Sequence, residues 1–368
     1  MTPRPGTQDA LLIQVLDGLL AQYLDKVPDA NRVVSLITDR GDRIQNDHIA
    51  FRSIDITSIL TIFLGLGYSV HMNPDTKKPF NFDKKKLTAV WLKHPNPDAP
   101  RVFVSQFRFD DGSPELQTIV QRYLGNWQDP IADVDMTSAQ SITGYLQTAH
   151  WPTPTYADYC ALQQESEYVA WVLVNKYYLN HFTLSVHGLA SFNFETELNR
   201  VISDYHISYT RHQSDTILDD AAAMMARKYY KNFEEFNHYL RDANFTMNQV
   251  GASVINRSPD GLLLQSSTKA ALIRVLFDEG YRDIPGSYVE FAYRGVTNDA
   301  IRRVIRSGGS MAMVTDDMRR DGFETQNADK IFESTYVGMD SHETDHQTQS
   351  SYEASCTALL AFFDNYYR

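Results

Sequence analysis

A short strand-like element occurs twice in this chain, at residues 47–54 and again at residues 180–187. In each copy a polar residue precedes a histidine, and polar and apolar residues then alternate, so that every second side chain points to the same face. His48 and Arg52 share a face in the first copy, and His181 takes the place of His48 in the second. A buried charge must be paired or must bind a ligand, which makes such a face costly in an ordinary core. Either copy alone is still compatible with a core histidine whose hydrogen bonds are satisfied.

The elements expected behind each copy follow one order, which is strand, helix, strand, strand and strand. Turn-forming residues and hydrophobic periodicity place them. The first unit is expected to hold a helix at residues 55–64 and further strands at 68–72, 87–93 and 101–109. The second is expected to hold a helix at residues 194–205 and further strands at 207–209, 261–268 and 287–294. Because an internal repeat indicates the architecture before any chemistry is considered, we predict an α+β fold built from two βαβββ units.

The repeat divides the chain into successive segments. These are N-terminal helices at residues 1–46, a first βαβββ unit at 47–112, a helical connection at 113–179, a second βαβββ unit at 180–296 and a C-terminal extension at 297–368. One long helical pattern is expected in the connection at residues 156–179, and a helical insert in the second unit at about 215–248. The aromatic side chains of the insert suit core packing, and closure of the insert over a ligand site is the alternative.

A third chemically distinctive residue lies in the last strand of the second unit. Glu290 stands in the middle of an apolar strand, where a carboxylate is a poor choice unless it is paired or binds a metal. Together His48, His181 and Glu290 supply two imidazoles and one carboxylate, each from a strand of a repeated unit. That is the ligand set of a facial triad, which leaves coordination positions open on Fe(II). An ordinary pair between Glu290 and an arginine of the sheet is the alternative.

Composition indicates which class of ligand and which cellular compartment to expect. The chain of 368 residues is 43% hydrophobic, enough for a sizeable core, and its formal charge of -12 argues against a nucleic-acid partner and for a small-molecule ligand. Its cysteines, Cys160 and Cys356, are too few for a disulfide framework, so we expect a reducing, cytoplasmic location. The apolar runs fall short of the roughly 18 residues that a membrane span needs, so no membrane partner is expected.

A second metal-binding pattern occurs near the C-terminus. The stretch 342–346 matches the His-Glu-x-x-His pattern of zinc metalloproteases, which requires both histidines on one face of an amphipathic helix. Polar, turn-like sequence flanks this stretch on both sides. A protease is therefore not the expected function.

The repeated order of elements resembles the vicinal oxygen chelate fold, in which two βαβββ units curl into a half-open barrel around a metal. The closing strands, at residues 262–268 and 288–294, are similar to those of hydroxyphenylpyruvate dioxygenase and hydroxymandelate synthase, where the glutamate is the third iron ligand. The residues around Asp47-His48 and Asn180-His181, with the Glu290 strand, resemble more closely the 2-oxoadipate dioxygenase/decarboxylase family. The resemblance extends over about residues 40–310.

This resemblance implies an Fe(II) enzyme that converts 2-oxoadipate and O2 to 2-hydroxyglutarate and CO2, a step in lysine catabolism. It makes His48, His181 and Glu290 the iron ligands. A dicarboxylate substrate needs a cation, and Arg52, on the same strand face as His48, is the candidate for this catalytic and substrate-binding role. Gln265 matches a substrate-contacting glutamine of the hydroxyphenylpyruvate enzymes, and Arg294 is a further substrate-binding candidate.

Two other functions stay open from the sequence. The same fold hosts isomerases and ring-cleaving dioxygenases, so a metalloenzyme acting on another oxo acid or on a catechol is the nearest alternative. A metal-free protein that binds a small molecule is the alternative outside the enzyme class. An oxo-acid oxygenase should consume O2 and release CO2, an isomerase should do neither, and a binding protein should keep its ligand affinity after chelation. The sequence gives no prediction of the oligomeric state.

Overall fold

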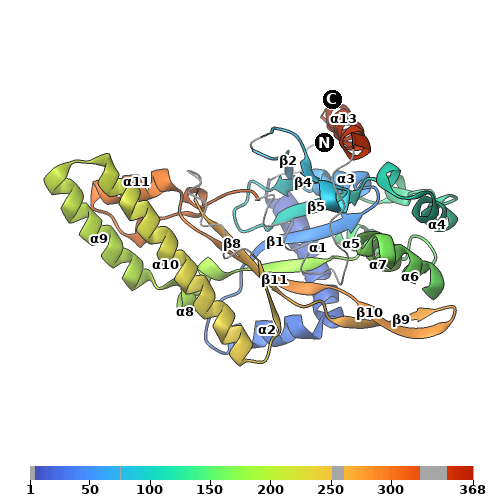
Figure 1. Cartoon of the computed structure of the whole chain (residues 1–368), viewed down its shortest axis with the longest axis horizontal. Coiled ribbons are helices and arrows are strands. Elements are labelled where there is room, and N and C mark those ends of the chain that lie inside the picture. The colour runs from blue at the N-terminus through green and yellow to red at the C-terminus, as the bar shows by residue number, and fades with distance from the viewer. Residues whose placement is uncertain (1–4, 75, 251–260, 324–345, 368) are drawn as a thin grey trace.

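The computed structural model describes residues 5–74, 76–250, 261–323 and 346–367. It is a mixed α+β fold around a nine-stranded sheet whose strands run in the order β2-β4-β5-β1-β6-β11-β8-β7, with β3 paired to β4 (Figure 1). A separate two-stranded sheet is formed by β9 and β10. The prediction of an α+β fold is confirmed.

The first half of the sheet comes from the first unit. Its elements are β1 (Asn46–Ser53), α3 (Thr57–Gly65), β2 (Ser69–His71), β3 (Phe80–Phe82), β4 (Leu87–Lys93) and β5 (Arg101–Phe107). β1 is parallel to β5, and β5 and β2 are both antiparallel to β4. The helix α3 buries its apolar side chains, including Ile59 and Phe63, against the core.

The second unit supplies the other half of the sheet, in the same internal order. Its elements are β6 (His181–Ser185), α8 (Ala190–Asn193), α9 (Glu195–His212), α10 (Asp215–Asp242), β7 (Met247–Val250), β8 (Leu263–Thr268), β9 (Leu272–Phe277), β10 (Gly280–Pro285) and β11 (Tyr288–Arg294). β6 is parallel to β11, and β11 and β7 are both antiparallel to β8. The leading strands β1 and β6 pair antiparallel at the centre, so the two halves meet through equivalent elements.

Several sequence-based expectations differ from the structure. Residues 207–209 lie inside α9, because no glycine or proline interrupts the helical pattern there, and β7 takes the place of the strand expected at that position. The pattern at 156–179 divides at Ser166, whose side chain caps a second helix. The strand expected through His187 ends at Ser185. Neither the β9–β10 hairpin nor the short strand β3 was expected.

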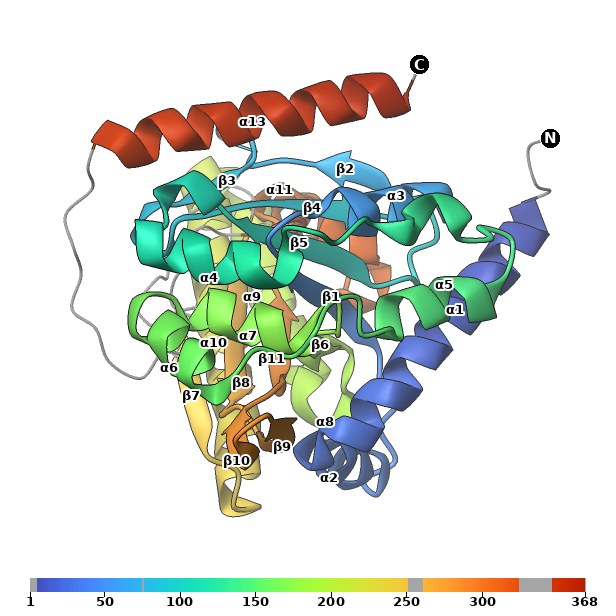
Figure 2. The same cartoon turned by 90° about the vertical axis from the view of Figure 1, so that its right-hand side faces the viewer.

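Helices pack around the sheet in separate groups. The remaining ones are α1 (Pro5–Lys26), α2 (Pro28–Thr38), α4 (Pro114–Leu124), α5 (Ala139–Gln147), α6 (Tyr156–Glu165), α7 (Glu167–Asn175), α11 (Asn298–Ser307) and α13 (His346–Tyr366). α9, α10 and α11 contact one another at one end of the molecule (Figure 1). α13 lies across the outside of the first unit (Figure 2), where Tyr352 donates a hydrogen bond to the Pro79 carbonyl. None of the described helices is long and apolar enough to cross a membrane.

Burial along the central strands follows from this arrangement. β1 is buried at every position after its first, and β6 and β11 are buried throughout. Strands covered on both faces normally carry apolar side chains, so the polar residues that these three strands bury need a specific explanation.

Candidate metal centre

Two histidines and one glutamate meet on the three central strands. His48 lies on β1, His181 on β6 and Glu290 on β11, and one ligand atom from each lies within 4.8 Å of the others. The strand register explains the meeting, because His48 and Glu290 both stand opposite Thr183 of β6. All three side chains are buried.

The residue before each histidine fixes the orientation of its ring. Nδ1 of His48 lies 2.8 Å from Oδ1 of Asp47, and Nδ1 of His181 lies 2.9 Å from Oδ1 of Asn180. These bonds leave both Nε2 atoms facing Glu290. Nε2 of His48 lies 3.5 Å from Oε1 of Glu290, and Nε2 of His181 lies 3.1 Å from Oε2. Hydrogen bonds of this kind to the second ring nitrogen are what orient histidines that bind metals.

The protonation of His181 favours metal binding. Burial lowers the pKa of His181 well below its usual range, and the nearby His48 and Arg52 lower it further. With its Nδ1 proton donated to the amide oxygen of Asn180, neutral His181 carries a lone pair on Nε2. The Nε2 atom lies 3.1 Å from Oε2 of Glu290. This carboxylate oxygen has no hydrogen-bond partner among the described residues. Two acceptor atoms in contact repel each other unless a cation lies between them, so this donor set fits a divalent metal.

His48 differs from His181 because it contacts two carboxylates. Although burial acts to lower the pKa of His48, its hydrogen bonds to Asp47 and Glu290 outweigh that effect, and the pKa is raised. The hydroxyl of Thr183 also lies 3.0 Å from Nε2 of His48. A metal at this position would replace the proton that the two carboxylates favour.

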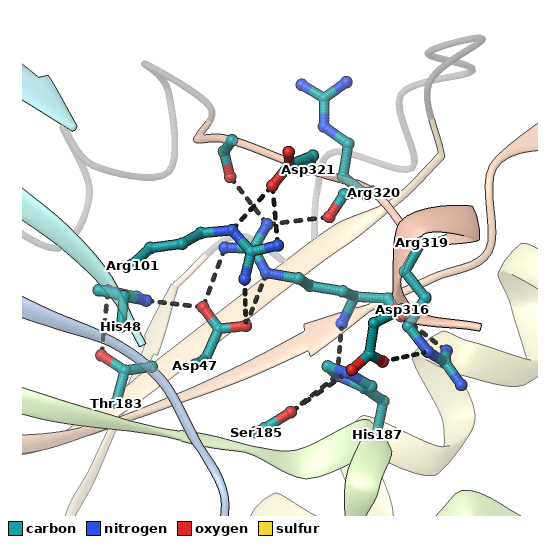
Figure 3. A network of polar contacts seen from close by, with 12 residues as sticks. Asp47, His48, Arg101, Thr183, Ser185, His187, Asp316, Arg319, Arg320 and Asp321 are labelled. Carbon is teal, nitrogen blue, oxygen red and sulfur yellow. Dashed lines mark hydrogen bonds and ion pairs between the residues drawn. The ribbon is translucent and has the colours of Figure 1, made fainter. Parts of the chain in front are cut away.

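A buried ion pair holds Asp47 in place. Arg294 donates two hydrogen bonds to Asp47, from Nε at 2.6 Å and from a terminal nitrogen at 2.9 Å, and Arg101 lies 3.9 Å away. Burial acts to raise the pKa of the Asp47 carboxyl, but Arg294 and the hydrogen bond from His48 hold it well below its usual range. Figure 3 shows Asp47 beside His48 and Arg101, in a network that continues to Asp321.

The triad lines a cavity that encloses about 380 Å³ of space, part of which is open to solvent. Its lining residues are His48, Ala50, Phe51, Arg52, Phe103, Ser105, Asn180, His181, Gln265, Tyr288, Glu290 and Phe323. Aromatic and aliphatic side chains make up much of the wall, and a small number of polar groups join them. This combination is typical of a small-molecule site.

Arg52 supplies a positive charge in this cavity. It follows His48 on β1, its side chain is buried, and its guanidinium carbon lies 5.4 Å from the ring centre of Tyr168 and 5.5 Å from that of Trp171, both on α7. Contacts of this kind between a cation and aromatic rings hold an arginine in a low-dielectric site. The geometry is suited to binding an anionic group within the cavity.

The other two predicted substrate contacts lie in different places. Gln265 of β8 lines the cavity, and its amide donates a 2.6 Å hydrogen bond to Oε1 of Glu290. Arg294 is not among the lining residues, because its guanidinium binds Asp47 and the backbone carbonyls of Arg320 and Gly322. The structure thus brings together every predicted site residue except Arg294.

Several residues of the site were not predicted. The hydrogen bonds by which Asp47 and Asn180 orient the two histidines could have been inferred, because a polar residue precedes the histidine in both copies. Tyr288 could have been inferred from its position on the Glu290 strand face. Phe323 lies outside both repeated units and carries no sequence signal. Of the His-Glu-x-x-His stretch, residues 342–345 lie outside the described residues.

The described part of the helical insert does not line the cavity. Among the described residues, α10 supplies none of the lining side chains, and its Phe236 packs at a ring distance of 5.0 Å on Phe291, on the other face of β11. The structure therefore shows core packing for the aromatic side chains of this helix.

Comparison with known proteins gives consistent matches. The family described as 2-oxoadipate dioxygenase/decarboxylase matches residues 15–304. A chloroplastic/amyloplastic 2-oxoadipate dioxygenase/decarboxylase of Oryza sativa subsp. japonica is 32% identical, with 90% of this chain and 80% of the relative covered. The crystal structure of hydroxyglutarate synthase in complex with 2-oxoadipate from Oryza sativa is 30% identical with a TM-score of 0.69, covering 91% of this chain and 95% of that chain. A glyoxalase-superfamily protein from Ralstonia eutropha JMP134 shares the fold at 19% identity and a TM-score of 0.54, covering 78% and 84%.

Proposed function

Since this chain belongs to the 2-oxoadipate dioxygenase/decarboxylase family, we propose that its cavity binds 2-oxoadipate beside a metal ion held by His48, His181 and Glu290. The reaction is conversion of 2-oxoadipate and O2 to 2-hydroxyglutarate and CO2. The observation that carries the proposal is the meeting of the triad and Arg52 in a single cavity. The solved relative that binds 2-oxoadipate supports the choice of substrate.

Fe(II) is the metal that we propose for this site. Two imidazoles and one carboxylate are the ligand set of non-haem Fe(II) oxygenases, and they leave positions open for other ligands. A ferrous ion bound there supplies the redox chemistry for oxidative decarboxylation of the 2-oxo acid by O2. The reaction balances without a second oxo acid, because one O2 and one 2-oxoadipate yield one 2-hydroxyglutarate and one CO2.

The side chains around the cavity bind the substrate and hold the metal ligands in position. Arg52 binds the carboxylate of 2-oxoadipate that lies farther from the keto group, and Tyr168 and Trp171 hold its guanidinium in position. Gln265 orients Glu290 through its hydrogen bond and also faces the substrate. Arg294 acts at a distance, by holding Asp47 against His48.

We further propose that the two βαβββ units curve into a half-open barrel around the cavity. The antiparallel pairing of β1 with β6 and the same strand order in both halves support this arrangement. A role in lysine catabolism follows from the substrate. The cytoplasmic expectation rests on Cys160 and Cys356, which are both free thiols, whereas the curated Oryza sativa relative named above is described as chloroplastic/amyloplastic.

The proposed reaction is tested by its stoichiometry. The protein is loaded anaerobically with Fe(II) and mixed with 2-oxoadipate and O2, and O2 uptake, CO2 and 2-hydroxyglutarate are measured together. We expect equal amounts of all three. Conversion of 2-oxoadipate to an isomer, without O2 uptake or CO2 release, would indicate an isomerase, and binding of 2-oxoadipate without turnover would indicate a binding protein.

A further inference from the structure

The ring of Phe323 is part of the cavity although it lies outside both repeated units. It is 4% exposed, and its centre lies 4.9 Å from the ring centres of both His48 and Phe103. Trp91 of β4 packs behind it at 5.6 Å. Phe323 therefore bounds the cavity at the His48 end, whereas Arg52 is four residues further along β1.

Charged contacts hold the segment that carries Phe323. The carboxylate of Asp321 lies 2.7 Å from Arg101 of β5 and 2.5 Å from Lys93 of β4. Arg294 of β11 donates to the carbonyls of Arg320 and Gly322, at 3.0 and 2.8 Å. Residues 319–323 are thus attached to both halves of the sheet, as the network in Figure 3 shows.

Gly322 allows the chain to turn toward the cavity. Its φ of +72° is in the left-handed region, and a Cβ at this position would lie 3.3 Å from the Trp91 ring. The same two arginines that hold this segment, Arg101 and Arg294, also contact Asp47, the partner of His48. The position of Phe323 and the orientation of His48 therefore depend on one network.

We propose that Phe323 is a specificity-determining residue and that Asp321 is the positioning residue that holds it. This inference rests on the proposed function, because it concerns the 2-oxo acid that the cavity binds. With the 2-oxo acid group at the triad, the keto end of the substrate, including the carbon next to the keto group, lies at the His48 end of the cavity, and the rest of the chain runs to Arg52. The Phe323 ring bounds that end and excludes 2-oxo acids that carry a branch on this carbon. It also excludes water from the reacting atoms.

Anaerobic calorimetry tests the proposal without turnover. The protein is loaded with Co(II) in the absence of O2, and the affinities for 2-oxoadipate and for 3-methyl-2-oxoadipate are compared. A methyl group that a wall excludes changes the preference by about 10-fold to 200-fold. We expect Phe323→Ala and the milder Phe323→Leu to shift the affinity ratio toward the branched acid by at least about 10-fold.

Matched variants separate this effect from a loss of stability. Phe277→Ala removes a ring of equal size, also buried, from β9 outside the cavity, and its affinity ratio should equal that of the wild type. Asp321→Asn should shift the ratio in the direction of Phe323→Ala by a smaller factor, and Asp321→Glu should restore the wild-type ratio.

The outcomes distinguish the inference from the proposed function. Unchanged ratios in both Phe323 variants would overturn the assignment of Phe323, and an unchanged ratio in Asp321→Asn would overturn that of Asp321. If the wild type binds 2-oxoadipate but consumes no O2 when loaded with Fe(II), the proposed reaction is wrong. A shift in the affinity ratio would then still support the role of Phe323 in selecting the substrate. If the wild type binds neither acid, both proposals fail.

Discussion

Asp47 and Asn180 occupy equivalent positions in the two units but differ in charge. Each accepts a hydrogen bond from the Nδ1 atom of the histidine that follows it. Only Asp47 is a carboxylate, and its charge is balanced by the buried Arg294. One histidine of the site therefore has an anionic partner and the other a neutral one, so their contributions to metal binding should differ.

The Asp47–Arg294 pair gives a stability prediction. Asp47→Asn leaves the buried Arg294 without its carboxylate partner, and Arg294→Met removes the two strongest hydrogen bonds to the buried Asp47 carboxylate. We expect each variant to lower the free energy of unfolding by about 3–5 kcal/mol. The double variant removes both charges and should be more stable than either single variant. Urea unfolding of the four proteins measures this coupling, and additive losses in the double variant would contradict it.

Arg52 gives a prediction about substrate recognition. Loss of a charge-assisted hydrogen bond costs about 1.5–3 kcal/mol, so Arg52→Ala should raise KM for 2-oxoadipate by about 10-fold to 100-fold. The acid 2-oxohexanoate lacks the second carboxylate and serves as the matched substrate. Its kcat/KM should be low and similar in both proteins. An equal loss for the two acids would show that Arg52 supports the structure and does not bind the second carboxylate.

At the scale of elements, α7 positions both Arg52 and β6. Tyr168 and Trp171 of α7 contact Arg52, and the chain then turns at Lys176 before it enters β6. Lys176 has a φ of +59°, its side chain is buried, and its ammonium donates to the Leu173 carbonyl at 2.7 Å. Strained backbone of this kind persists when the surrounding structure enforces it, which fits a turn that sets the position of His181.

The buried Lys176 predicts a pH dependence of stability. Burial lowers its pKa from 10.5 to about 8, so the folded protein favours the neutral amine. The resulting cost is absent above pH 10.5 and complete below about pH 8. Lys176→Met should therefore be more stable than the wild type at pH 7, by at most about 3 kcal/mol, and this advantage should disappear as the pH approaches 10.5. A difference in unfolding free energy that does not vary between pH 7 and 10.5 would contradict the prediction.

The strength of local patterns decides which elements could be predicted. The strand at 87–93 was predicted with the bounds that the structure shows, because turn-forming residues separate this apolar run from the next strand. β7 is short and largely polar, and its place in the sheet depends on pairing with β8. A pattern of four residues carries too little information for such a strand, so residues 207–209 were chosen wrongly in its place.

At the scale of the whole molecule, the repeat predicted the site better than the flanking segments did. His48, His181 and Glu290 could be selected because equivalent strands of two units must meet. The role of Phe323 and the binding of Arg294 to Asp47 and to residues 320–322 depend on how the C-terminal extension folds back on the sheet. Contacts between such distant segments leave no periodic pattern in a single sequence.

Metal binding should stabilise the whole fold. The triad draws one ligand from each of three adjacent strands, so an ion that binds only the folded chain stabilises it by about 2.7 kcal/mol at 100 times its Kd. We expect Co(II) to raise the melting temperature of the wild type, and chelation to reverse the rise. Glu290→Gln keeps the shape of the side chain but should show little rise. A rise equal to that of the wild type would place the metal elsewhere.

The most direct measurement is the number of metal ions per chain, together with O2 uptake, in variants of the triad. After anaerobic loading with Fe(II) and desalting, the wild type should retain one ion and consume O2 with 2-oxoadipate. His48→Ala, His181→Ala and Glu290→Ala should lose both properties, whereas His94→Ala, which changes a buried histidine outside the cavity, should keep both. If any triad variant retains the ion with wild-type affinity and full turnover, the metal centre is not formed by these three residues.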